Sequence, residues 1–115
     1  MLEYLTTAER RWYILQHMGA VELVHRRVVL AEDAFAEVVI WQIEEPVSPA
    51  RHRFKYRLAY VVAGECVVRY DNERGKGDHR HFDTIETAYR FSTAEQLMAD
   101  FAADIGRWDR EHGRS

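Results

Sequence analysis

An alternation of charged and apolar residues between positions 53 and 62 constrains the fold of this chain more than any other feature. Arg53, Lys55 and Arg57 occupy the first odd positions, whereas the even positions from Phe54 onward are aromatic or aliphatic. Side chains of a β-strand alternate between its two sides. The spacing therefore predicts a strand with one basic side and one core side.

A turn over residues 63–65 predicts that the chain returns as an antiparallel partner of this strand. If three residues form the turn, Leu58 lies opposite Tyr70 and Arg57 lies opposite Asp71. Both strands then agree on which side is apolar, whereas a two-residue turn mixes the two sides. We therefore expect the register of the three-residue turn.

The other segments predict an α+β fold. Residues 21–30 and 35–43 are rich in β-branched and aromatic residues and indicate a second antiparallel pair. Apolar residues at helical spacing follow a capping signal near Thr93. The expected organisation is a single domain with a short helical extension at 1–18, an antiparallel sheet of about four strands over 20–92 with a motif loop at 72–82, and a packing helix at 93–112.

Length and composition exclude several classes of protein. The chain has 115 residues, which suits one domain, and its longest apolar run has six residues, Leu58–Ala63. That run is too short for a membrane span, and the N-terminus lacks the pattern of a signal peptide, so we expect a cytoplasmic protein. The lone Cys66 excludes an internal disulfide and a cysteine-based zinc site.

The net charge of −3 conceals a basic region in the middle of the chain. Residues 1–50 carry a net charge of −4, residues 51–81 carry +4 and residues 82–115 carry −3. A basic patch of this kind is typical of nucleic-acid binding, although it is also compatible with a merely solvated stripe. The candidate nucleic-acid-binding residues are Arg53, Lys55, Arg57, Arg69, Arg74 and Lys76.

Two histidines in this basic region are the strongest catalytic candidates. If His79 and His81 are extended, their side chains share one face about 7 Å apart, from a rise of roughly 3.3 Å per residue. That separation suits the two sides of one phosphodiester, as in a metal-independent ribonuclease without cofactors. Asp78 is a further catalytic candidate, because it could orient a neighbouring histidine. Arg80 and Tyr70, which lie near the two histidines in the motif, are also catalytic candidates. Gly75 and Gly77 would let backbone amides approach a phosphate.

Three alternatives remain open at this point. The His-x-His spacing also suits a metal ion with Asp71, Asp78 or His52 as a third ligand, as in a metal-dependent nuclease. Both histidines are also compatible with a structural role in a loop. A non-catalytic module that binds nucleic acid or protein through the basic region is the alternative of a different class.

The stretch from Arg51 to Arg107 resembles the TumE family of type II toxin-antitoxin toxins, and the strand pair before it, from about Val21, also fits. The words Arg-Tyr-Asp-Asn and Gly-Asp-His-Arg-His carry the resemblance. Residues 1–18 have no clear counterpart, and Ala63 stands where an Asp is usual. The matching motif positions are Arg69, Tyr70, Asp71, Asn72, Gly77, Asp78, His79 and His81.

The resemblance implies a growth-inhibiting toxin and a partner. The partner is a helix-turn-helix antitoxin that neutralises the toxin by direct binding, and an acidic segment of it would suit residues 51–81. Small toxins of this size commonly act on RNA, so an RNA substrate is expected. The sequence leaves the oligomeric state open, with a homodimer among the alternatives.

Overall fold

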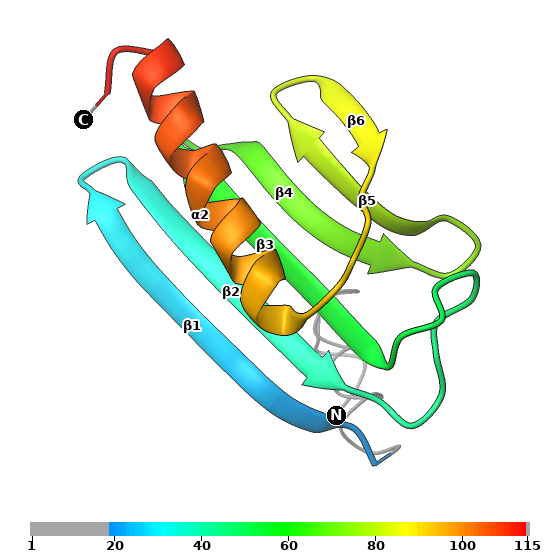
Figure 1. Cartoon of the computed structure of the whole chain (residues 1–115). Helices are drawn as coiled ribbons and strands as arrows, with labels where there is room; N and C mark the ends of the chain where they lie inside the picture. Colours follow the sequence, from blue (N-terminus) through cyan, green and yellow to red (C-terminus); the bar gives the residue numbers. More distant parts are fainter. Residues whose placement is uncertain (1–18, 115) are drawn as a thin grey trace, which may run out of the picture.

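The structure is a computed structural model that describes residues 19–114. Within this range six antiparallel strands form one sheet in sequence order, and a helix packs on it (Figure 1). The elements are β1 (Val21–Ala31), β2 (Ala34–Gln42), β3 (Phe54–Val62), β4 (Glu65–Glu73), β5 (Gly77–Phe82), β6 (Ile85–Ala88) and α2 (Ala94–Glu111). The α+β class and the C-terminal helix are confirmed, the expected count of about four strands is wrong, and the helix predicted within residues 1–18 lies outside the described residues.

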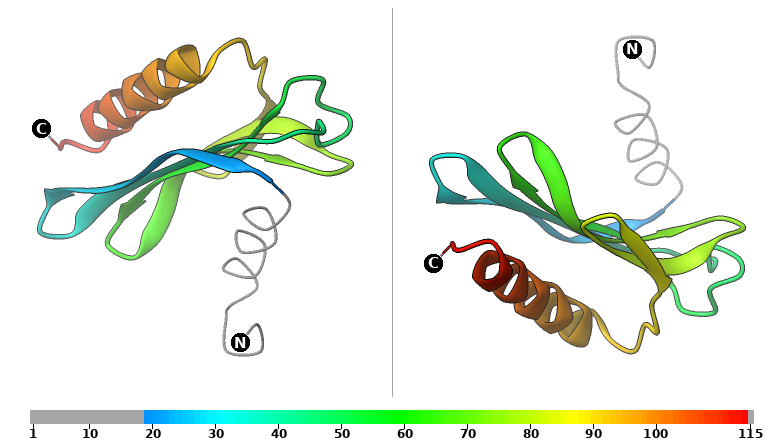
Figure 2. Two further views of the ribbon diagram at one scale, coloured as in Figure 1. Left: turned by 90° about the horizontal axis from the view of Figure 1, so that it is seen from below. Right: turned by 90° about the horizontal axis from the view of Figure 1, so that it is seen from above.

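The helix α2 lies on one side of the sheet, which we call the helix face (Figure 2). Leu97, Phe101 and Trp108 are buried there against apolar residues from the core side of β2, β3 and β4. The helix begins where the sequence predicts, because the Thr93 hydroxyl accepts a hydrogen bond from the Gln96 backbone N–H at 3.0 Å. The opposite side of the sheet is called the second face.

The β3–β4 hairpin has the predicted register, with Leu58 opposite Tyr70. Its turn differs from the prediction, because Val62 pairs with Glu65 and only two residues lie between them. A register shift beside Val61 inserts the additional residue into the ladder. The bulge therefore keeps both strands apolar on the helix face despite the shorter turn.

Most of the segment over residues 72–82, predicted as a motif loop, is strand, as the extended His79 and His81 of the catalytic hypothesis require. The strand β4 continues to Glu73, and after a short turn β5 begins at Gly77. Gly77 has a φ of +81°, and a Cβ atom there would lie 3.2 Å from Cγ of Pro49, so the end of the turn requires glycine. The sequence shows no apolar alternation in β5, because Asp78 and Arg80 on the helix face are as polar as His79 and His81 on the second face. It hides β6 because all four residues of that strand are exposed.

Candidate functional site

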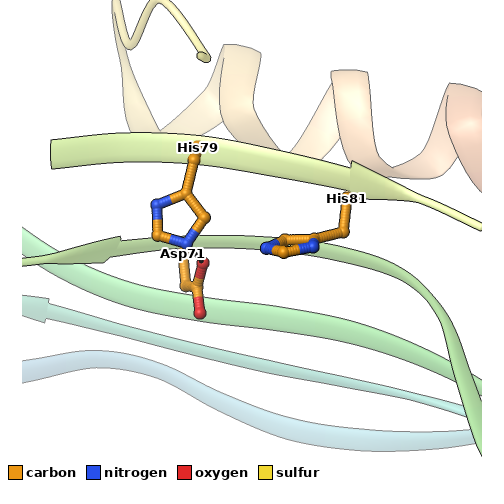
Figure 3. A group of neighbouring side chains, drawn as sticks. All are labelled: Asp71, His79 and His81. Atoms are coloured by element: carbon orange, nitrogen blue, oxygen red, sulfur yellow. Dashed lines mark ion pairs between the residues drawn. The ribbon is translucent and has the colours of Figure 1, made fainter. Parts of the chain in front are cut away.

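The motif residues of β4 and β5 divide between the two faces of the sheet. Four of their side chains lie on the second face and come from neighbouring strands: Arg69, Asp71, His79 and His81, the last three of which are drawn in Figure 3. Their neighbours along the chain lie on the helix face: Tyr70, Asn72, Asp78 and Arg80. The strand period therefore separates residues that the sequence presents as one cluster.

His79 and Asp71 form the buried part of the second-face cluster. His79 is 3% exposed, and its Nε2 lies 2.6 Å from Oδ1 of Asp71, which pairs with it across the strands. The other ring nitrogen, Nδ1, lies 3.0 Å from the Gly77 carbonyl oxygen. Because a carbonyl only accepts, Nδ1 carries a proton and donates it. Both nitrogens of His79 are thus directed at oxygen atoms.

His81 is the more accessible histidine of the cluster. Its ring centroid lies 5.2 Å from that of His79, closer than the 7 Å expected from the strand rise, and 21% of its side chain is exposed. Arg69 donates a hydrogen bond to Nε2 of His81 at 2.8 Å. Burial, together with the Arg69 charge, lowers the pKa of His81, so the ring favours its neutral form.

Glu86 on β6 completes this surface, and the sequence analysis missed it. Its Oε1 lies 3.8 Å from Nε2 of His81 and 4.0 Å from Nε2 of His79. Lys76 forms an ion pair with the same carboxylate, which lowers the pKa of Glu86 and raises that of Lys76. The signal was absent because β6 has no apolar alternation, so nothing placed Glu86 beside β5.

Tyr70 and Arg80 belong to a polar network under α2. Arg80 binds Asp104 of the helix through two hydrogen bonds, from Nε to Oδ2 at 2.5 Å and from Nη2 to Oδ1 at 2.9 Å. The Tyr70 hydroxyl donates to Oδ2 of Asp104 at 2.5 Å and accepts from Nε of Arg80 at 3.0 Å. Burial and the Asp104 carboxylate raise the pKa of Tyr70. The two catalytic candidates therefore lie across the sheet from the histidines, where they join α2 to the strands.

Asp78 contacts residues other than the histidine beside it in the sequence. Its Oδ1 accepts from the Tyr56 hydroxyl at 2.5 Å and lies 2.8 Å from Nε2 of His52. The backbone N–H of Phe54 donates to Nδ1 of His52, so Nε2 carries the ring proton and donates to Asp78. Asp78 is thus placed to orient His52, and the structure does not place it against His79.

Asn72 is fully buried and links β4 to the start of β3. Its Oδ1 accepts from the Tyr56 backbone N–H at 3.1 Å, and its Nδ2 donates to the Phe54 carbonyl oxygen at 2.7 Å. A side-chain amide has both a donor group and an acceptor group, and an apolar residue has neither. The Asn of the motif therefore has a structural task in this fold.

The basic candidates differ in exposure. Arg53, Arg74 and Lys76 are exposed, and Arg57 and Arg69 are half-buried. Lys55 is 7% exposed, and its ammonium donates to the backbone carbonyl of Asn72.

The turn glycines also differ from the sequence expectation. The Gly75 amide donates to the Ser48 carbonyl at 2.7 Å, so it is engaged within the chain. Gly77 is buried against Pro49 and shapes the end of the turn. The cations nearest the histidines are Arg69 and Lys76, and they supply the positive charge at the cluster.

The chemistry of the cluster follows from its donor atoms. Asp71, His79 and His81 each offer one ligand atom, and these atoms lie within 4.8 Å of one another. Two imidazoles and a carboxylate can exchange protons with a substrate or coordinate a metal ion. Arg69 lies 3.3 Å from Oδ2 of Asp71 and is within reach of the same space, so an anionic group has a cation to contact.

Comparisons with known proteins identify the family. The family described as Toxin TumE matches residues 11–111, so the match begins earlier in the chain than the sequence motifs indicate. No curated protein and no solved structure matches the chain significantly. No helix within residues 19–114 is long and apolar enough to cross a membrane. With nearly its whole length matched and the Arg-Tyr-Asp-Asn and Gly-Asp-His-Arg-His motifs on adjacent strands, the chain belongs to the TumE family of toxins.

Proposed function

We propose that this toxin inhibits growth by cleaving RNA at the cluster of Asp71, His79 and His81. The observation that supports the proposal best is the convergence of these three side chains beside the Arg69 guanidinium on the second face. Ionisable groups that are close together, partly buried and flanked by cations are typical of sites that act on phosphates.

The reaction is a transesterification within the RNA chain. The 2'-hydroxyl loses its proton to a base and its oxygen attacks the adjacent phosphorus. The bond from phosphorus to the 5'-oxygen breaks, and that oxygen takes up a proton. The products are a 2',3'-cyclic phosphate and a 5'-hydroxyl end, and no water is consumed.

The residues have different access to such a substrate. His81 has 21% of its side chain exposed, and the cations Arg69 and Lys76 have 29% and 48%, so an RNA phosphate reaches these three groups first. The guanidinium of Arg69 stabilises negative charge on the phosphoryl oxygens. His79 has both nitrogens directed at protein oxygens, which makes it a poor proton-exchange partner for RNA. The two-imidazole mechanism expected from the sequence therefore needs an additional activating group.

Toxin family membership implies an antitoxin partner. We infer a helix-turn-helix protein with an acidic segment that covers the accessible cations of residues 51–81, foremost the exposed Arg53 and the half-buried Arg57. Charge reversal at these two residues is expected to weaken antitoxin binding, measured by calorimetry. Lys55 is left unchanged in that variant, because it is buried.

Sequencing of RNA ends after induction tests the function. In cells lacking the antitoxin, wild-type protein should produce new 5'-hydroxyl ends and arrest growth, and His81→Ala should abolish both. His25→Ala is the matched control, because its side chain is 58% exposed and lies on β1, away from the cluster. Growth arrest with intact RNA contradicts the proposal and favours a non-catalytic binding toxin.

A further inference from the structure

We propose that Asp71, His79 and His81 bind a divalent transition-metal ion such as Zn²⁺ or Mn²⁺. As an account of catalysis this inference rests on the proposed RNA cleavage, whereas the binding site itself stands on the geometry of the cluster. The structure directs one ligand atom of each side chain to a common region on the second face (Figure 3).

The tautomer of His79 leaves its Nε2 atom facing another acceptor. Its Nδ1 donates to the Gly77 carbonyl, so in the neutral ring Nε2 bears a lone pair. The Nε2 atom lies 2.6 Å from Oδ1 of Asp71, which is also an acceptor. Among residues 19–114, neither of these two buried atoms has a hydrogen-bond partner of acceptable geometry. A cation between them satisfies both.

The hydrogen bond from Nδ1 is itself typical of a metal-ligating histidine. Such residues almost always donate their other ring N–H to a carbonyl or carboxylate, which fixes the ring and the tautomer. Ligand atoms at about 2.0–2.1 Å from a tetrahedral ion lie about 3.3 Å apart. Nε2 of His79 and Oδ1 of Asp71 therefore need to separate by less than ~1 Å, which a small carboxylate rotation achieves.

The charge around the cluster also fits a divalent ion. The carboxylates of Asp71 and Glu86 supply two negative charges beside the two imidazoles. In the structure Arg69 forms an ion pair with Asp71, and Lys76 forms one with Glu86. A metal ion would replace the Arg69 contacts to Asp71 and His81, which releases the guanidinium for an RNA phosphate.

Exposure places the open coordination position at the edge of the cluster. His79 lies deep, whereas His81 and Glu86 are reached by solvent. Three protein ligands with one position left for water or substrate are typical of a catalytic metal site. The metal thus supplies the activating group that an enclosed His79 does not provide.

Calorimetric titration of the full-length, chelator-treated chain with Zn²⁺ and with Mn²⁺ tests the site. We expect one ion per chain for at least one metal and a loss of affinity of more than about 100-fold in His79→Ala and Asp71→Asn. His81→Ala should also weaken binding, and it keeps the test decisive if the buried substitution His79→Ala unfolds the chain. His25→Ala is the matched control and should bind like the wild type.

Arg69→Gln gives a result of opposite sign. Removal of the internal cation should tighten metal binding by about 10-fold or more, while RNA cleavage falls because the phosphate contact is lost. Absent binding of both metals, or equal affinity in wild type, His79→Ala and His81→Ala, overturns the metal site. RNA cleavage that continues in EDTA overturns the catalytic role of the metal but leaves the proposed function standing. Stoichiometric binding without RNA cleavage supports the site and contradicts the proposed function.

Discussion

The two faces of the β4–β5 ladder hold polar residues of similar burial but different pairing. On the helix face, Arg80, Tyr70 and Asp104 satisfy one another with four hydrogen bonds. On the second face, His79 and Asp71 are equally buried, yet each has a side-chain atom without a hydrogen-bond partner among the described residues.

The difference shows what distinguishes a structural network from a site. Burial of a polar atom costs free energy unless it has a hydrogen-bond partner, so a buried atom without one calls for an explanation such as a catalytic role or a bound ion. Asp104 and His79 are 8% and 3% exposed, so burial alone does not separate the two networks. Pairing separates them, and each network should respond differently to substitution.

The largest effect is expected on the second face. Asp71→Asn should lower the rate of RNA cleavage by about 10²- to 10⁴-fold, because the cluster loses its charged member. The free energy of unfolding should change by less than about 1 kcal/mol, since the amide has the same shape as the carboxylate. Single-turnover cleavage and urea unfolding measure the two quantities. An unchanged rate would remove Asp71 from the site.

The helix face should lose stability when its network is broken. Arg80→Ala should lower the free energy of unfolding by about 2–3 kcal/mol, because Asp104 is left without its cation. The value stays below that of a fully buried pair, since 24% of the Arg80 side chain is exposed. Arg90→Ala is the control, because Arg90 is exposed. Equal unfolding midpoints for the two variants would contradict a clamp between α2 and the sheet.

Substitution of Asn72, on the same face, should lower the free energy of unfolding by less than substitution of Arg80. Asn72→Ala removes the hydrogen bonds to the Tyr56 N–H and the Phe54 carbonyl, and we expect a loss of about 2 kcal/mol in urea unfolding. Thr87→Ala on the exposed strand β6 is the control. If both substitutions cost the same, the amide does not hold β3 and β4 together.

The smallest effect concerns alkaline pH. Burial and the hydrogen bond to Asp109 raise the pKa of Tyr60 to about 12. The unfolded chain ionises this group near its ordinary value of 10, so wild-type stability is complete below about pH 10 and declines as the pH rises toward 12. Tyr60→Phe should decline less steeply in urea midpoints from pH 8 to 11. Parallel curves for both proteins would exclude the contribution of Tyr60.

Much of the fold followed from local patterns. The alternation from Phe54 onward predicted the core side of β3, and the pairing of Leu58 with Tyr70 followed because only one register keeps both strands apolar on one side. The capping signal at Thr93 predicted the start of α2. The pattern failed at β5 and β6, since strands with polar or exposed side chains carry no apolar period.

The candidate site was predicted in part. The His-x-His spacing by itself determined that His79 and His81 share one face if they are extended, and the structure supplies the strand β5 and brings Asp71 beside them. Only the tertiary structure decided that Arg80 reaches Asp104, that Glu86 approaches the histidines and that Lys55 is buried. The physical reason is that a period assigns a side chain to a face, whereas its partner depends on which distant segment packs there.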